Sequence, residues 1–234
     1  MNINTALIKN KVFKGAISSD LVKTSQEYRV LAVLRYLFPG KFEQMEHGDN
    51  PDLQDKVNSA GIEVTVAVQG NDMKANRAFA EIDKYSSDSQ RIAVKKITES
   101  GYDINNTNGI MSISRSGTAD SEKTCLQNAI IKKCKKADKY KKDYARIGLA
   151  VLLPEIPTSY AEDHIIDWIK EIHSEIKTSF DLIYVISSRF CIICDIKNDY
   201  MDKKCLENTD NQLLCKIARM TAEGDLMLDS IEWK

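Results

Sequence analysis

Residues 61–68 read Gly-Ile-Glu-Val-Thr-Val-Ala-Val, and this stretch determines the kind of fold that the rest of the chain can build. Its β-branched residues, with a glycine near either end, predict a central strand. Because side chains alternate along a strand, Glu63 and Thr65 share one face and the aliphatic residues between them share the other. Burying the Glu63 carboxylate in such a strand costs several kcal/mol unless another group compensates its charge. One face is therefore apolar, and the other presents a carboxylate and a hydroxyl.

Helices and strands are predicted to alternate around this strand. Apolar residues at helical spacing predict helices over residues 19–38, 71–100 in two pieces, 121–143, 160–177 and 211–221. Ser19 or Asp20 can cap the first of them. Further strands are predicted over residues 110–114, 147–153, 181–187 and 190–196. This order favours an α/β fold with a mixed central sheet flanked by helices. We expect one domain over residues 1–197, with residues 198–234 as a C-terminal extension packed on it.

Composition excludes several classes of protein. The 234 residues carry 33 Lys and Arg against 34 Asp and Glu, which excludes a protein that packages nucleic acid by bulk positive charge. No apolar run reaches the ~18 residues of a membrane helix, and the N-terminus has no signal-peptide pattern, so no membrane partner is expected. Six cysteines in such a chain predict reduced thiols in a cytoplasmic protein. Cys191 and Cys194 have the spacing of a metal-binding pair, but they are predicted on opposite faces of a strand and are interpreted as buried free thiols.

An acidic turn precedes the central strand. Residues 49–55 read Asp-Asn-Pro-Asp-Leu-Gln-Asp, and Asp52 is expected to lie close to Glu63. Two carboxylates that converge from a turn and a neighbouring strand form a site of hard oxygen ligands suited to Mg²⁺ or Mn²⁺. Such an ion can activate a water molecule and stabilise the charge that develops on a phosphate during hydrolysis. Asp52 and Glu63 are therefore the predicted metal ligands. His47 is interpreted as a loop residue, with a place in the pocket as the alternative.

The pair Pro51-Asp52, followed after ten residues by Glu63-Val64-Thr65, resembles the motif of the restriction-endonuclease-like PD-(D/E)xK nuclease superfamily. The predicted order of helix, acidic turn, strand, helix and strand is also similar, over roughly residues 20–155. The resemblance implies a restriction-endonuclease-like core and a Mg²⁺- or Mn²⁺-dependent endonuclease that hydrolyses DNA, with RNA as an alternative substrate. A homodimer would suit an enzyme that cuts both strands. In many members the first helix carries a glutamate that contacts the metal through water, and Glu27 stands at that position.

The chain departs from this motif at one position. Thr65 stands where the family has a lysine that orients or activates the attacking water. Some members carry this cation on the following helix, where Lys74, Arg77 and Lys84 are the candidates and Lys84 is preferred. The predicted catalytic set is thus Glu27, Asp52, Glu63, Thr65 and Lys84. Two alternatives stay open: a catalytically inactive nuclease fold that binds DNA or a protein partner, and an α/β interaction protein in which the acidic pair is incidental.

A lysine-rich segment follows on the third predicted helix. Residues 132–142 contain seven lysines among eleven residues. Such a run is typical of a solvated helix end, where lysines are favoured near the negative end of the helix dipole. It also suits local contact with the phosphate backbone by a protein whose net charge is only −1. The candidate nucleic-acid-binding residues are Lys132, Lys133, Lys135 and Lys136.

Overall fold

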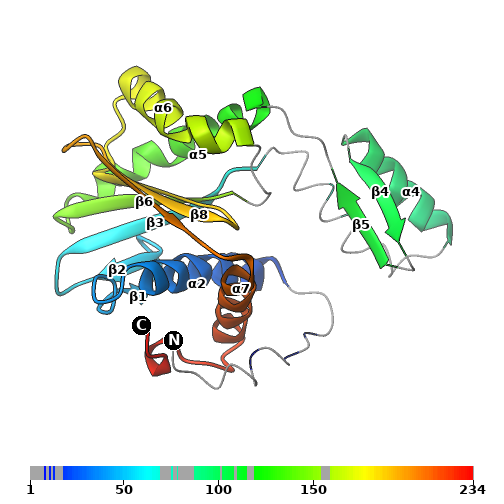
Figure 1. Ribbon diagram of the computed structural model, residues 1–234, viewed down its shortest axis with the longest axis horizontal. Helices are drawn as coiled ribbons and strands as arrows, with labels where there is room; N and C mark the ends of the chain where they lie inside the picture. The colour runs from blue at the N-terminus through cyan, green and yellow to red at the C-terminus, as the bar shows by residue number, and fades with distance from the viewer. Residues whose placement is uncertain are drawn as a thin grey trace.

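The computed structural model describes residues 18–68, 87–100, 102–107, 110–114, 119–153 and 159–233, together with residues 8, 11, 13, 75 and 78. Within these residues a seven-stranded sheet forms the centre of the molecule (Figure 1). Its strands, in spatial order, are β1 (Glu46–His47), β2 (Leu53–Asp55), β3 (Ala60–Val66), β6 (Arg146–Leu152), β7 (Leu182–Ile186), β8 (Phe190–Asp195) and β9 (Tyr200–Cys205).

The sheet is mixed. β3, β6 and β7 are parallel neighbours, and the other neighbouring pairs are antiparallel. Helices α2 (Ser19–Leu37) and α7 (Asn208–Ala222) cover one face, and α5 (Ala119–Tyr140) and α6 (Ser159–Ile176) cover the other (Figure 1). The prediction of an α/β fold with a mixed sheet between helices is confirmed.

Strand β3 separates two hydrophobic cores. Ile62 and Val64 belong to the core shared with α2 and α7, whereas Leu149, the partner of Glu63 on β6, belongs to the core beneath α5 and α6. The predicted alternation along residues 62–66 is therefore confirmed, and Glu63 faces α5. The same alternation places Cys191 in the first core and Cys194 in the second, and both thiols are free, as predicted.

Helix α2 begins at the predicted residue but has a different cap. The Ser18 hydroxyl accepts a hydrogen bond from the Leu21 N–H at 3.2 Å, where Ser19 or Asp20 was expected to act. Ser18 takes this role because its backbone is extended, with φ −68° and ψ 157°, as a residue just outside a helix must be. The helix ends before Pro39, and Gly40 adopts a φ of +81° in the turn that follows.

Four strands lie in segments that were not predicted as strands: β1, β2, β4 (Asp103–Thr107) and β9. β9 lies at the sheet edge and is largely exposed. It has no apolar run, because an edge strand can be held by hydrogen bonds to its one neighbour and does not need a buried face. The segment 198–234, predicted as an extension packed on the domain, supplies β9 and helix α7. The buried Leu214 and Ile217 of α7 lie in the same core as Ile62.

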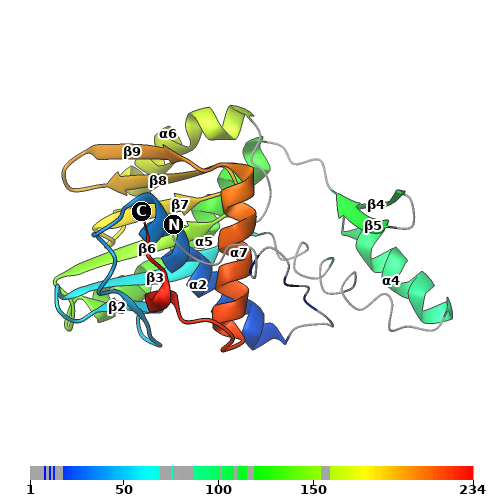
Figure 2. The ribbon, with the colours of Figure 1, turned by 60° about the horizontal axis from the view of Figure 1, so that its bottom comes forward.

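A smaller unit occupies the connection between β3 and α5. It consists of helix α4 (Ser87–Glu99) and the antiparallel pair of β4 with β5 (Ile110–Ser114), and it lies apart from the large sheet in two views (Figures 1 and 2). Ala93, Ile97 and Tyr102 form a small core of its own. The strand predicted over 110–114 is confirmed. Of the helix predicted over 71–100, most of the first piece lies outside the described residues.

No helix in the described part of the chain is long and apolar enough to cross a membrane.

Candidate functional site

The candidate site lies where the acidic turn, β3, α2 and α5 meet. The register that pairs Leu53 with Ile62 on β2 and β3, continued by one residue, brings Asp52 opposite Glu63. Beyond the last paired residues of β2, the buried Asp52 side chain provides the acceptor for β3: its Oδ2 accepts a hydrogen bond from the Val64 N–H at 2.8 Å. Asp52 and Glu63 are therefore separated in sequence by the number of residues that the β2–β3 hairpin needs to bring them opposite each other.

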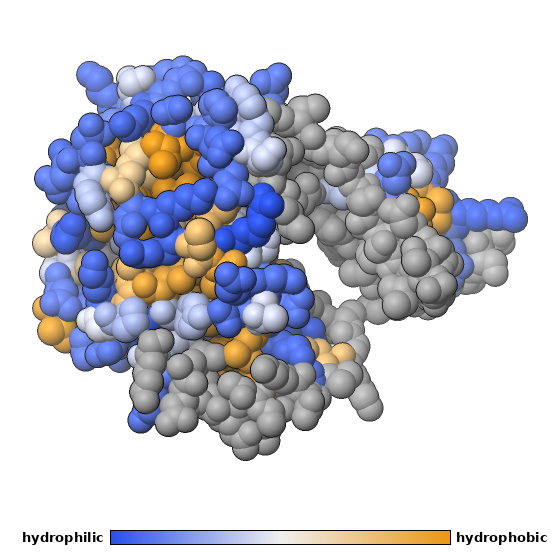
Figure 3. Space-filling view, viewed as in Figure 1, coloured by the Kyte–Doolittle hydropathy of each residue, from blue (hydrophilic) through white to orange (hydrophobic). Residues whose placement is uncertain are grey.

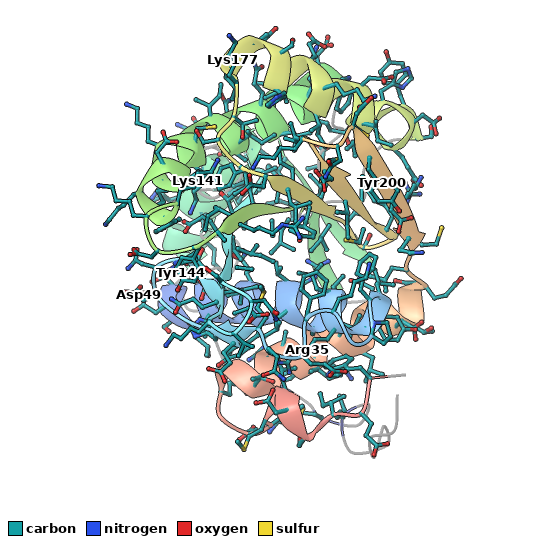
Figure 4. The ribbon with its side chains drawn as sticks, turned by 90° about the vertical axis from the view of Figure 1, so that its left-hand side faces the viewer. Arg35, Asp49, Lys141, Tyr144, Lys177 and Tyr200 are labelled. Atoms are coloured by element: carbon teal, nitrogen blue, oxygen red, sulfur yellow. The ribbon has the colours of Figure 1, made fainter. Side chains whose placement is uncertain are left out.

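A glycine allows the turn to approach the strand this closely. Pro51 packs against Gly61, and a Cβ on Gly61 would collide with the proline ring. The turn therefore lies directly on β3, and Asp52 is held beside the strand that carries Glu63. Figure 4 shows this end of the molecule, with Lys141 just beyond α5 and Asp49 in the acidic turn.

Glu63 is fully buried and is compensated by one face of α5. Lys133 Nζ and Lys136 Nζ lie 2.5 Å and 2.7 Å from Glu63 Oε1, and the Tyr140 hydroxyl donates to Oε2 at 2.9 Å. These three residues follow at i, i+3 and i+7, the spacing of a single helix face. Burial by itself would raise the pKa of Glu63, but the hydrogen bonds from the two lysines outweigh it and hold the pKa below the usual value. Glu63 is an anion at neutral pH.

Helix α2 contributes a third carboxylate, Glu27, which is also buried. Its Oε2 lies 2.7 Å from His47 Nε2, and the His47 ring stacks on Tyr28 with 4.8 Å between the ring centroids. Its Oε1 lies 3.1 Å from Lys23 Nζ. Burial raises the pKa of Glu27, and the interactions with His47 and Lys23 lower it to a value below normal.

Lys23 links this glutamate to the acidic turn, because its Nζ also lies 3.6 Å from Asp52 Oδ1. Asp52 is the least compensated of the three carboxylates. Burial, together with the negative charges of Glu63 and Glu27, raises its pKa to about 6, although the Val64 hydrogen bond and the charge of Lys133 act in the opposite direction. The three carboxylates therefore act on one another as a single electrostatic cluster.

The structure assembles most of the predicted site residues. Glu27, Asp52 and Glu63 form the cluster just described. Thr65 lies two residues beyond Glu63 on the same face of β3, paired in register with Val151. Lys84, the preferred cation, lies outside the described residues, as do Lys74 and Arg77.

The predicted nucleic-acid-binding lysines divide between two faces of α5. Lys132 and Lys135 are exposed, whereas Lys133 and Lys136 turn toward Glu63. The Lys133 side chain is only 14% exposed and the Lys136 side chain 48%, so Lys133 belongs to the site and Lys136 lies at its rim. In Figure 3 hydrophilic residues form the upper margin of the molecule, over α6, and a hydrophobic patch lies between this margin and the sheet.

Sequence reasoning missed Lys23 and Tyr140 as residues of the site, predicted Lys133 only as a nucleic-acid-binding residue, and gave His47 a place in the pocket only as an alternative. The position of Lys23 four residues before Glu27 was a usable signal, because side chains at this spacing are neighbours on a helix. Tyr140 follows Lys133 at seven residues, which also places both on one face. His47 gave no comparable signal, because the short strand β1 brings it to Glu27 from a polar segment.

The donor chemistry of the cluster fits a hard divalent cation. Mg²⁺ at phosphate-processing sites is commonly held by one or two carboxylates, with water and substrate oxygens as the other ligands. Asp52 and Glu63 provide two carboxylates of this kind, and the buried Glu27 Oε1 is contacted by the Lys23 ammonium group at 3.1 Å without a hydrogen bond of standard geometry. The described residues nevertheless contain no group of three or more His, Cys, Asp or Glu side chains arranged to hold a metal ion.

Comparison of the chain with models of known families, with characterised proteins and with solved structures finds no match. Its chemistry is therefore inferred from the side chains of the site.

Proposed function

We propose that this protein is a metal-dependent phosphodiesterase that hydrolyses DNA, with RNA as an alternative substrate. The observation that carries the proposal is the juxtaposition of two buried carboxylates, Asp52 from the turn and Glu63 from β3, with the ammonium group of Lys133 on Glu63. Perturbed carboxylates that share a site with a fixed cation are typical of catalytic centres.

The order of elements supports the same proposal. Helix α2, the acidic turn, β3, α5 and β6 follow one another as the PD-(D/E)xK resemblance implies, and β3 and β6 are parallel neighbours. The smaller unit with α4, β4 and β5 is an insertion between β3 and α5 in this scheme. A restriction-endonuclease-like core is therefore part of the proposal.

Each residue of the site has a chemical role in this reaction. Asp52 and Glu63 would hold Mg²⁺ or Mn²⁺, which when bound lowers the pKa of a water molecule and neutralises charge on the phosphate. Lys133 supplies the positive charge that Thr65 does not, and its ammonium group can donate to a phosphate oxygen or orient the attacking water. The Thr65 hydroxyl, on the same face as Glu63, is a further donor for that water. Glu27 orients His47 and Lys23 at the rim.

Substrate contact is assigned to α5. Exposed Lys132 and Lys135 lie on the same helix as the site lysines, so one element can contact the phosphate backbone on its outside and the scissile phosphate on its inside. Such contacts are electrostatic and do not depend on base sequence.

One observation favours a second function, that of an inactive nuclease fold that binds DNA or a protein partner. Each of the three carboxylates already lies beside a lysine, and within the described residues no larger group of metal ligands surrounds them. If these ion pairs are permanent, the site binds no metal. The lysines of α5 would then bind DNA or a protein partner without catalysis.

Nuclease assays on wild type and two site variants, Asp52→Asn and Glu63→Gln, test the proposal. Asp181→Asn is the matched control: Asp181 is also buried, accepts a strand N–H, that of Ile147, at 2.8 Å, and pairs with a lysine, but it lies outside the site. We expect Mn²⁺-dependent cleavage that both site variants reduce at least ~100-fold and that the control retains.

Calorimetric titration with Mn²⁺ separates the two functions. A binding heat that Glu63→Gln abolishes supports the phosphodiesterase. Folded wild-type protein that binds DNA, takes up no Mn²⁺ and cuts neither DNA nor RNA would establish the inactive alternative instead.

A further inference from the structure

One cation already lies between two carboxylates of the site. The Lys23 ammonium group is 3.1 Å from Glu27 Oε1 and 3.6 Å from Asp52 Oδ1, so it joins a helix carboxylate to a turn carboxylate. A divalent cation held by Asp52 and Glu63, as proposed, would share Asp52 Oδ1 with Lys23. Lys23 therefore competes with any such ion for its ligands.

Helix stability accounts for only part of this contact. In a pair spaced by four residues the lysine stabilises the helix better when it follows the glutamate, and here Lys23 precedes Glu27. The contact with Asp52 also leaves the helix altogether and reaches the turn before β2. Lys23 thus serves the charge balance of the site.

The three groups differ in their freedom to move. The Lys23 side chain is 65% exposed, whereas those of Glu27 and Asp52 are 4% and 5% exposed. His47 holds the other oxygen of Glu27, and the Val64 N–H holds the other oxygen of Asp52. The carboxylates are fixed and the ammonium group is free to swing into solvent, so a change of cation needs no rearrangement of the fold.

The formal charges of the site also favour the departure of an ammonium group when a divalent cation binds. Its three carboxylates face the three ammonium groups of Lys23, Lys133 and Lys136, so their formal charges already cancel. Adding a divalent cation leaves an excess of positive charge in a largely buried place, which is unfavourable unless an ammonium group leaves or a phosphate arrives. Lys23 is the most exposed of the three lysines.

We infer that Lys23 occupies the cation position of the ion-free protein, is displaced when Mg²⁺ or Mn²⁺ binds, and then pairs with a phosphate of the nucleic acid. This inference rests on the proposed function. It makes ion binding and substrate binding reinforce each other, because each removes the charge imbalance that the other creates. The ion is then held weakly until substrate is present.

Mn²⁺ binding without nucleic acid gives the first test, measured from the electron paramagnetic resonance signal of free Mn²⁺. In Lys23→Met the competing charge is gone and the side chain remains long, so we expect binding about two- to tenfold tighter than in wild type. Lys23→Arg keeps the charge and should bind Mn²⁺ as wild type does. Lys95→Met is the control, because it removes an exposed lysine with the same spacing to Glu99, on α4.

A second series adds a double-stranded oligonucleotide with a phosphorothioate backbone, which resists hydrolysis in Mn²⁺, at fixed ionic strength. In wild type the oligonucleotide should tighten Mn²⁺ binding severalfold, and in Lys23→Met this gain should shrink. Equal or weaker Mn²⁺ binding by Lys23→Met, with binding in wild type that Asp52→Asn abolishes, overturns the displacement of Lys23 and leaves the proposed function intact. Absence of Mn²⁺ binding in wild type and Lys23→Met alike overturns the metal site and the proposed function with it.

Discussion

Burial and charge compete at each carboxylate of the site. Glu63 and Glu27 have enough positive partners to remain anions with pKa values below normal, whereas Asp52 depends on one backbone N–H and the longer contact from Lys23. A residue that is poorly compensated in the free protein gains most from a bound cation. Asp52 is therefore the residue at which the site is most sensitive to pH and to metal.

The pH dependence of stability follows from the pKa of Asp52, which rises from 3.8 to about 6 on folding. Between these values the folded state holds a proton that the unfolded state releases, so this contribution to stability is complete below about pH 4 and is lost as the pH rises through 6. We expect wild type to lose about 1–3 kcal/mol relative to Asp52→Asn between pH 4 and 7, since a shift of one unit corresponds to about 1.4 kcal/mol. Urea denaturation at a series of pH values measures this difference. A difference that is constant with pH would contradict the assignment.

Elements decide which side chains meet. Helix α5 presents Lys133, Lys136 and Tyr140 to Glu63. Other lysines of the same segment are exposed on its outer side, so one lysine-rich segment both compensates a buried carboxylate and faces solvent. The β2–β3 hairpin sets Asp52 opposite Glu63 through its register. Helix and hairpin can therefore be altered separately.

On the outer side of α5, the double variant Lys132→Gln/Lys135→Gln should weaken DNA binding about equally for all sequences. If each lysine contacts one phosphate, the slope of log K against log salt should fall by about 2. Fluorescence anisotropy over a salt series measures the slope. Lys170→Gln/Lys177→Gln, two exposed lysines at α6, is the control and should leave the slope unchanged; an equal loss in this control would mean that the effect is one of net charge.

In the hairpin, Gly61→Ala should disturb the site without removing any of its polar groups. The added Cβ would collide with the ring of Pro51, a rigid side chain that has little room to yield. We expect a loss of about 1–3 kcal/mol in the free energy of unfolding. Because the turn must move, Mn²⁺ binding should weaken as well. Unchanged stability and unchanged Mn²⁺ binding would show that the turn does not depend on this contact.

At the scale of the whole molecule, buried polar links connect segments that are distant in sequence. The Arg35 guanidinium group donates to the carbonyl oxygens of Phe42, Glu43 and Met45, and to Asp229 near the C-terminus at 2.7 Å. It thereby anchors the segment that leads into β1 and His47. Arg35 is thus one of several side chains of α2 that join the C-terminal part of the chain to the helix that carries Glu27.

The substitution Arg35→Met should lower the free energy of unfolding by about 3 kcal/mol, because it removes the donors of the buried Met45 carbonyl oxygen and of the half-buried carbonyl contacts at Phe42 and Glu43. Asp229→Asn is the matched variant. The Asp229 side chain is 71% exposed, so its loss should have an effect of at most about 1 kcal/mol. Thermal or urea denaturation distinguishes the two effects. Equal effects of both variants would show that the ion pair, and not the carbonyl contacts, carries the stabilisation.

The sequence by itself determined the order and approximate bounds of the long helices and buried strands, and the position of Glu63 on the polar face of β3. It could do so because hydrophobic periodicity and side-chain alternation are local properties. It also indicated Asp52, since an acidic turn that shortly precedes a strand is expected to lie close to it, although the strand β2 that sets the register was not predicted.

Only the tertiary structure decided which cations compensate these carboxylates. Lys133 lies seventy residues from Glu63 in sequence, and His47 reaches Glu27 from a two-residue strand without an apolar pattern. The polar edge strands β1 and β9 exist for the same reason: their neighbours in the sheet stabilise them, while their own residues do not. Charge compensation depends on distance in space, and that distance is set by how the layers pack.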